Sequence, residues 1–176
     1  MGVQFFREEH EIFRRSLRSF LDKEVKPRLD EWRKNRQIPR DIWRKMGEQG
    51  FIGYWLDEKY GGVGADFIYS VVLIEEMHRS GAWGLATAVG VHNDIVMPYI
   101  EMLGTEEQKI RWLPKCCTGE YIAAIGMTEP GAGSDLQAIR TCATRDGDEY
   151  VINGQKTFIT NGYYCDVIVL AVKTDP

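Results

Sequence analysis

The chain has 176 residues, of which 44% are hydrophobic and 27% are charged, and its formal net charge is −4. This length and composition are sufficient for a folded core, and the acidic balance gives no bulk electrostatic attraction to nucleic acid or to an anionic membrane. No apolar run approaches the ~20 residues that a membrane-spanning helix requires, so we expect a globular protein with neither a nucleic-acid partner nor a membrane span.

The cysteines and histidines show no spacing typical of a metal site or a disulfide framework. Cys116 and Cys117 are adjacent, an arrangement whose geometry disfavours a bridge between them. We therefore expect free thiols in a reducing compartment and no metal. The charged N-terminus lacks the apolar segment of a secretory signal, which fits a bacterial cytoplasm or, in a eukaryote, the mitochondrial matrix.

The first two thirds of the chain show apolar residues at helical spacing. Residues 12–29 form one such face, which Pro27 is expected to disturb. Thr105 and Gln108 match a capping box, and we expect the helix that they start to end at Pro114. Together these patterns predict an all-α domain over residues 1–118. Further helices are expected over residues 38–50, 66–79, 82–91 and 93–103.

From residue 119 the hydrophobic period shortens toward that of a strand, and glycines mark turns. Asn153-Gly154 signals a two-residue hairpin, and the apolar run 166–173 is typical of a strand buried on both faces. The predicted fold class is α+β, with an antiparallel β domain over residues 119–176. A lone sheet of this size leaves an unpaired edge, so we expect this β domain to be truncated. The other expected strands are 121–125, 138–145 and 150–152, with a turn over 146–148.

One stretch concentrates chemistry-bearing residues, Ile125–Asp135, with the sequence IGMTEPGAGSD. It places the hydroxyls of Thr128 and Ser134 beside a Pro-Gly turn and a further glycine. Glycines at this density let backbone N–H groups approach a ligand closely, or let φ become positive. The stretch is either a cradle for a ligand with phosphates and a polar ring or a surface turn without a ligand. A second hydroxyl-bearing loop, Phe158–Thr160, would share its rim if the strands pair.

These segments resemble the acyl-CoA dehydrogenase flavoproteins. The resemblance lies in three runs that follow one another along the chain: Met127–Asp135 (MTEPGAGSD), Tyr150–Lys156 (YVINGQK) and Phe158–Gly162 (FITNG). The loop Tyr60–Gly62 and the helix start Gly104–Gln108 also look like that family's helical domain. The resemblance covers essentially the whole chain and looks closest to the long-chain branch of the family.

The resemblance implies FAD as the cofactor. Within the implied site, Ser134 also contacts the thioester substrate, Phe158 covers the flavin ring, and Thr160 hydrogen-bonds near its N5 atom. Phenylalanine keeps the apolar cover but lacks the indole N–H of the tryptophan found in many relatives. The residues assigned to flavin binding are Ile125, Met127, Thr128, Gly133, Ser134, Phe158, Ile159 and Thr160.

The motif contains two carboxylates, Glu129 and Asp135. Dehydrogenation needs a base that removes the α-proton while hydride leaves the β-carbon. We interpret both carboxylates as loop-stabilising groups, with a catalytic role as the alternative, because Asp favours such turns. The resemblance places the family's base on a Glu downstream of Pro176, together with a C-terminal four-helix bundle, so no catalytic residue is assigned within this segment.

The activity that the resemblance implies is α,β-dehydrogenation of acyl-CoA thioesters to trans-2-enoyl-CoA, of the fatty-acid β-oxidation type. It further implies an electron-transfer flavoprotein as electron acceptor, a homodimer or homotetramer, and an acyl cavity walled partly by residues 82–91 and 96–103. Two alternatives stay open: an acyl-CoA oxidase and a non-catalytic binding or assembly module of the same fold. For the 176 residues alone we expect weak or no flavin binding and no turnover.

Overall fold

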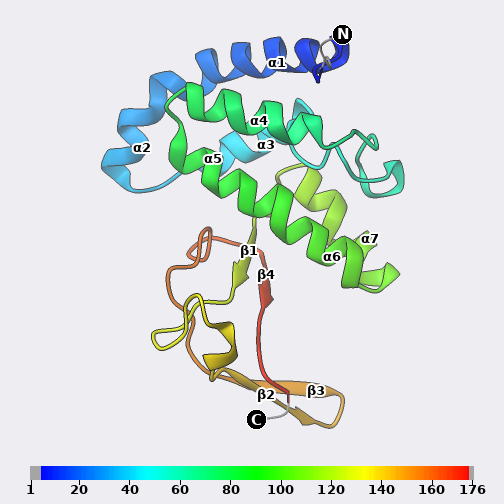
Figure 1. Ribbon diagram of the computed structural model, residues 1–176, viewed down its shortest axis with the longest axis vertical. Helices are drawn as coiled ribbons and strands as arrows, with labels where there is room; N and C mark the ends of the chain where they lie inside the picture. The colour runs from blue at the N-terminus through cyan, green and yellow to red at the C-terminus, as the bar shows by residue number, and fades with distance from the viewer. Residues whose placement is uncertain (1–4, 175–176) are drawn as a thin grey trace.

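The computed structural model describes residues 5–174. Figure 1 shows a body of helices from which two pairs of strands extend. A helical domain followed by a small sheet region is the architecture expected from the sequence, and this part of the α+β prediction is confirmed. None of the helices within 5–174 combines the length and the apolar character that a membrane crossing needs.

The N-terminal helix is interrupted where the sequence predicts it. Helix α1 (Glu8–Phe20) runs into a π-helical turn (Leu21–Val25) and a 3-10 turn (Lys26–Arg28), which contains Pro27, before α2 (Leu29–Asn35). Proline lacks the N–H that a regular helix needs, so the change of register at this point has a local cause.

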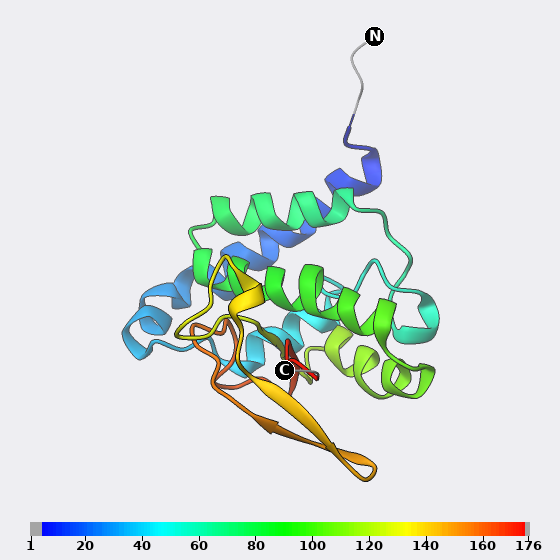
Figure 2. The ribbon, with the colours of Figure 1, turned by 60° about the horizontal axis from the view of Figure 1, so that its bottom comes forward.

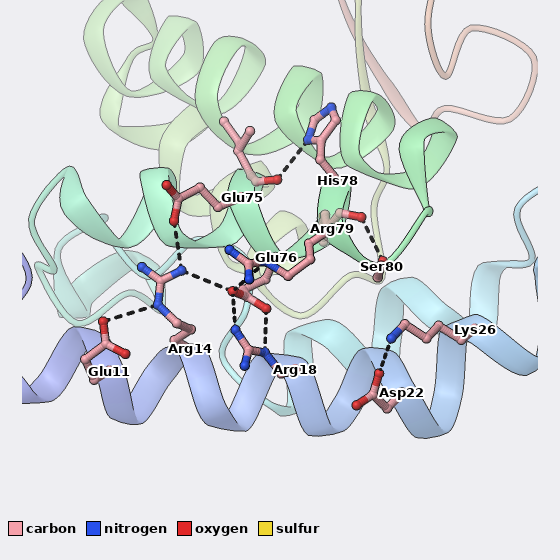
Figure 3. Close-up of polar contacts among 12 residues, drawn as sticks. Glu11, Arg14, Arg18, Asp22, Lys26, Glu75, Glu76, His78, Arg79 and Ser80 are labelled. Atoms are coloured by element: carbon pink, nitrogen blue, oxygen red, sulfur yellow. Dashed lines mark hydrogen bonds and ion pairs between the residues drawn. The ribbon is translucent and has the colours of Figure 1, made fainter.

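Helix α1 packs along α4 (Ile68–Arg79), and a buried carboxylate joins them (Figure 3). Glu76 accepts two hydrogen bonds of 2.8 Å from the Arg18 guanidinium and one of 3.1 Å from Arg14. The hydrogen bonds from Arg18 hold the pKa of Glu76 below its ordinary value. A carboxylate that is 2% exposed is thus paired and hydrogen-bonded, as burial requires.

Two expected helices form one rod. Helix α5 (Trp83–Gly90), a π-helical turn η4 (Val91–Val96) and α6 (Met97–Leu103) are continuous in Figure 1. The sequence predicts helices over 82–91 and 93–103, with Pro98 inside the second as a kink or a boundary. Pro98 lies at the boundary where the π-helical turn gives way to α6, and the change of register there accommodates its missing N–H.

Helix α7 (Glu106–Cys117) starts at the predicted capping box, where Thr105 accepts from the Gln108 amide. The prediction that it ends at Pro114 is wrong, because the helix continues for three more residues. Burial of Cys116 and Cys117 stabilises this last turn and offsets the hydrogen bond that the proline removes. The remaining long helix is α3 (Arg40–Glu48).

The strands form two separate pairs. Strand β1 (Ala123–Gly126) pairs with β4 (Val167–Leu170) in parallel, and β2 (Cys142–Asp146) pairs with β3 (Glu149–Asn153) antiparallel around the expected turn. The expectation of an antiparallel sheet is therefore wrong for β1 and β4. The chain between them, which includes the β2–β3 hairpin, is long enough for the crossover that a parallel pair needs.

Two strand expectations fail for local reasons. Asn153-Gly154 does not form a hairpin: a Cβ added at Gly154 would lie 2.3 Å from the Thr141 hydroxyl, so this glycine serves a close approach. The run 166–173 is not buried on both faces among the described residues. Val169 packs against the core, whereas Ile168 on the opposite face is 40% exposed, because only one face of β4 meets the helical body.

Candidate functional site

The structure brings the two hydroxyl-bearing loops together. The Thr157 amide donates to the Thr128 carbonyl over 2.9 Å, and Lys156 Nζ donates to the Met127 carbonyl over 3.1 Å. The chain beyond β1 and the chain beyond β3 therefore run side by side, although they are distant in sequence. This contact places Thr128 next to the segment that leads into Phe158.

Glu129 holds this junction together. Its carboxylate accepts from the backbone amides of Arg140 (2.6 Å) and Thr141 (3.0 Å), from the Thr141 hydroxyl, and from Lys156 Nζ (2.8 Å). The bond from Lys156, followed by that from the Thr141 hydroxyl, lowers the pKa of Glu129 to about 2. The interpretation of Glu129 as a loop-stabilising group is confirmed by these contacts.

Asp135 also bonds locally. Its Oδ1 atom accepts from the Gln137 amide over 3.1 Å at the start of a 3-10 turn, Leu136–Ala138. Both carboxylates of the motif are thus engaged in holding backbone, as the turn chemistry of the sequence indicated.

The hydroxyls of three predicted site residues have no such engagement. Within residues 5–174, the side chains of Thr128, Ser134 and Thr160 make no hydrogen bond to protein atoms under 3.5 Å. Ser134 is exposed, while Thr128 and Thr160 are half-buried. Gly133 is open as well, since a Cβ added there would meet nothing within 4 Å. These groups can therefore hydrogen-bond to a ligand.

Phe158 has an unusual backbone and an exposed ring. Its φ is +55°, a conformation uncommon for a residue with a bulky side chain, and the side chain is 93% exposed. Backbone strain of this kind costs about 1–3 kcal/mol and clusters at functional sites. The next residue, Ile159, is half-buried, and its carbonyl accepts from the Gly162 amide to close the turn.

The other predicted residues are less closely gathered. Ile125 lies on β1 opposite Val169, and Met127 follows directly after the strand. Gly133 and Ser134 lie beyond a tight turn in which Glu129 and Ala132 exchange both backbone hydrogen bonds. In the part of the chain that the structure describes, no hydrogen bond joins Gly133 or Ser134 to residues 158–160.

Sequence reasoning missed His92, which fixes β1 to the helical body. Its Nδ1 atom accepts from the Ala123 amide over 3.0 Å, so the proton lies on Nε2, which donates to the Cys116 carbonyl over 3.1 Å. Burial lowers the pKa of His92 to about 4, which keeps the ring neutral. The histidine spacing matched no metal pattern, and no local signal marks a contact with a strand so far along the chain.

Asn161 was missed as well, because its Asn-Gly pair reads as a turn. The Nδ2 atom donates to the carbonyls of Ala88 on α5 (2.9 Å) and Ala123 on β1 (3.1 Å). The side chain therefore joins the second hydroxyl loop to a helix and to a strand. Asn161 is 7% exposed, and its φ is +64°.

A face of small residues lies on α5. Gly84, Thr87 and Gly90 are not buried, and a Cβ added at either glycine would meet nothing within 4 Å. Farther along the rod lies an open surface depression of about 380 Å³. Its lining consists of Asp94, Ile95, Pro98, Tyr99, Met102 and Leu103.

These residues fit a flavin. The free hydroxyls and the open glycine backbone offer donors to a polar ring and to phosphates, and the exposed Phe158 ring offers an apolar cover. For a metal ion there is no comparable set: residues 5–174 contain no group of three or more His, Cys, Asp or Glu side chains placed to hold one.

Comparison with known proteins gives a consistent result. Residues 7–120 match the family model for the acyl-CoA dehydrogenase N-terminal domain, and residues 124–176 match that for the acyl-CoA dehydrogenase middle domain. The chain is 44% identical to the mitochondrial long-chain specific acyl-CoA dehydrogenase of Mus musculus over 176 residues, which are 99% of this chain and 40% of the mouse protein.

Two solved structures are also similar. An acyl-CoA dehydrogenase from Geobacillus kaustophilus matches 99% of this chain with a TM-score of 0.95 and 59% identity, over 46% of its own length. A glutaryl-CoA dehydrogenase from Mycobacterium smegmatis in complex with FADH2 matches 97% of this chain with a TM-score of 0.91 and 31% identity, over 44% of its length. The chain thus spans less than half the length of these relatives.

Proposed function

Since the chain belongs to the acyl-CoA dehydrogenase family, we propose that it serves FAD-dependent α,β-dehydrogenation of acyl-CoA thioesters to trans-2-enoyl-CoA. The observation that most supports this proposal is the hydrogen bond between Thr157 and Thr128. It sets a free hydroxyl beside the exposed, strained Phe158, and these are the two loops that the family resemblance assigns to the flavin.

FAD would lie across the ends of β1 and the 158–160 loop. Ile125, Met127 and Thr128 would line the ring, with Thr160 as a further donor, and Gly133 and Ser134 would face the pyrophosphate. When bound, FAD supplies the hydride acceptor of the reaction. Phe158 and Ile159 would exclude water from the ring, and the Glu129–Lys156 pair keeps the two loops at a fixed spacing.

The acyl chain would follow the small-residue face of α5 and η4. Gly84, Thr87 and Gly90 leave room for a chain there, and the depression beside Ile95 and Met102 lies farther along the same rod. Room of this kind suits a long acyl group, and the mouse relative is named for long-chain substrates. Ser134 would contact the thioester.

The catalytic base would come from outside the segment that this chain matches. Glu129 is buried and accepts four hydrogen bonds, and Asp135 accepts the Gln137 amide at a turn, so we assign neither as the base. We therefore expect residues 1–176 alone to bind FAD weakly and not to turn over. The boundary between residues 1–118 and 119–176 stays a prediction, as do an electron-transfer flavoprotein acceptor, a homo-oligomer, and a bacterial cytoplasmic or mitochondrial matrix location.

The test is to purify the protein expressed from its complete reading frame and to follow the flavin absorbance. We expect bound FAD and anaerobic bleaching by long-chain acyl-CoA, with trans-2-enoyl-CoA as the product. Hydrogen peroxide release matching turnover in air would favour the oxidase alternative. A preparation that takes up no FAD, or that leaves bound flavin oxidised with acyl-CoA of every length, would contradict the proposal and favour a non-catalytic module.

A further inference from the structure

Asn161 joins three elements of the site through one side-chain amide. Its Nδ2 donates to a helix carbonyl, that of Ala88, and to a strand carbonyl, that of Ala123. Asn161 directly follows Thr160 in the second hydroxyl loop. One buried side chain therefore sets the position of this loop against both the rod α5–η4–α6 and β1.

The orientation of this amide is determined by its surroundings. Two carbonyl oxygens face the nitrogen, so a flipped amide would place its own oxygen against two acceptors and lose both hydrogen bonds. The Oδ1 atom is buried and has no hydrogen-bond partner among residues 5–174. The two hydrogen bonds from Nδ2 thus fix the side chain, although its Oδ1 atom is left without a partner.

The helix end of this contact lies at a change in backbone register. The Val91 amide is shared between the carbonyls of Ala88 and Thr87, and the π-helical turn η4 begins at Val91. Such turns are frequent at functional sites. Ala88 also lies between Thr87 and Gly90 in the sequence, which are two of the three residues of the small-residue face. Asn161 therefore anchors the rod at the point where the acyl chain would lie.

The backbone conformation of Asn161 also supports its role as an anchor of the loop. Its φ of +64° is one of three positive values among the non-glycine residues of the described chain, and Asn tolerates this conformation better than most residues. The Gly162 amide donates to Ile159 and the Tyr164 amide donates to Asn161, so the loop is closed on both sides of the amide. A rigid turn transmits the position of the anchor to Phe158–Thr160.

We propose that Asn161 is a positioning residue, which sets the flavin-contacting loop at a fixed distance from the acyl-bearing face of α5 and η4. This inference rests on the proposed function. If the acyl chain lies on the rod and the flavin lies against the loop, the amide of Asn161 determines how the thioester and the flavin are aligned. A misplacement of about 1 Å can cost about 10²-fold in rate.

The experiment uses the protein from its complete reading frame and two variants of graded effect. Asn161→Gly keeps the left-handed backbone and removes both donors, whereas Asn161→Ser keeps one hydroxyl donor. Arg36→Gly is the matched control, because Arg36 has a similar φ of +52° at the end of α2, on the helical body. The readouts are the rate of flavin reduction per bound FAD at saturating acyl-CoA and amide hydrogen exchange of the flavin-free protein.

We expect Asn161→Gly to lower the reduction rate about tenfold to 10²-fold, Asn161→Ser to fall between it and the wild type, and Arg36→Gly to stay within about twofold. Exchange at the Gly162 and Tyr164 amides should rise about tenfold in Asn161→Gly and stay unchanged in Arg36→Gly. If Asn161→Gly does not fold, the comparison of Asn161→Ser with the wild type decides.

The two proposals fail in distinguishable ways. A wild-type protein without flavin reduction contradicts the proposed function. A wild-type protein that is reduced by acyl-CoA, together with Asn161 variants that react at the same rate per bound FAD, overturns only the role of Asn161. Variants that merely melt earlier, with unchanged rate and unchanged exchange at Gly162 and Tyr164, overturn it as well.

Discussion

The helical body and the strand extension are stabilised in different ways. In the body, large side chains such as Leu17, Trp43 and Met46 are completely buried and belong to one hydrophobic core. In the extension, all five residues of β3 are exposed, and Figure 2 shows the β2–β3 hairpin projecting away from the rest of the chain. The site loops therefore depend on a few polar contacts, those of Glu129, His92 and Asn161, while the body depends on its core.

The strongest test of this contrast removes apolar side chains from each region. We expect Leu17→Ala to lower the free energy of unfolding by about 2–5 kcal/mol, because it leaves a cavity in a packed core. Ile152→Ala on β3 should change it by about 0.5 kcal/mol or less, because that side chain is 47% exposed. Urea unfolding followed by circular dichroism measures both, and equal losses would show that the hairpin is covered in solution.

The next largest effect is a pH dependence of stability that comes from His92, which joins β1 to the helical body. Folding lowers the pKa of His92 from 6.5 to about 4, so the folded protein holds this ring neutral while the unfolded chain protonates it. The contribution of His92 is complete above pH 6.5 and is lost as the pH falls to about 4, a change of about 3 kcal/mol. Urea unfolding between pH 7 and pH 4 measures this loss.

The control for this pH dependence is His78→Gln, because His78 is exposed and bonds only to a carbonyl of its own helix. We expect this variant to keep the full loss of stability between pH 7 and pH 4. The buried role of His92 is contradicted if the free energy of unfolding is constant over this range, or if His78→Gln removes the dependence.

The sequence predicted the body better than the extension, for reasons that particular residues show. Helix periodicity and the Thr105 cap are local signals, and they placed the helices to within a few residues. The parallel pairing of β1 and β4 depends on a crossover that no local pattern encodes. Asn161 and His92 form hydrogen bonds with backbone carbonyls and amides that are distant in sequence. Because nearly every residue has these backbone groups, the sequence does not indicate which of them a side chain contacts.

A smaller and more local effect is expected at the loop junction. Glu129→Gln keeps the side-chain shape but removes the charge that pairs with Lys156, whose side chain is 9% exposed. We expect faster amide exchange at Arg140 and Thr141, which donate to Glu129, and an unchanged melting temperature of the helical body. Asp135→Asn, which alters an exposed carboxylate with one backbone bond, should change exchange less.

The Glu129 contribution also has its own pH window. Folding lowers its pKa from 4.5 to about 2, so the stabilisation is complete above pH 4.5 and is lost as the pH falls toward 2. This window lies below that of His92, so acid should release the rod from β1 before it opens the loop junction. If Glu129→Gln abolishes flavin reduction while amide exchange at Arg140 and Thr141 stays the same, the result supports a catalytic role of Glu129 and contradicts its structural role.

The smallest expected effect has the opposite sign. Phe158 has a φ of +55° and its ring is in solvent, so the contacts of the ring offset little of the backbone strain. Phe158→Gly relieves that strain and should raise the free energy of unfolding by about 1 kcal/mol, less the entropy that glycine adds to the unfolded chain. The same variant should weaken FAD binding, because the ring is lost. Phe5→Gly, at an aromatic outside the site that is 70% exposed, should change neither quantity in this way. We therefore expect Phe158 to destabilise the protein without FAD and to make favourable contacts only when FAD is bound. A Phe158→Gly protein that is less stable than the wild type yet binds FAD normally would contradict this role.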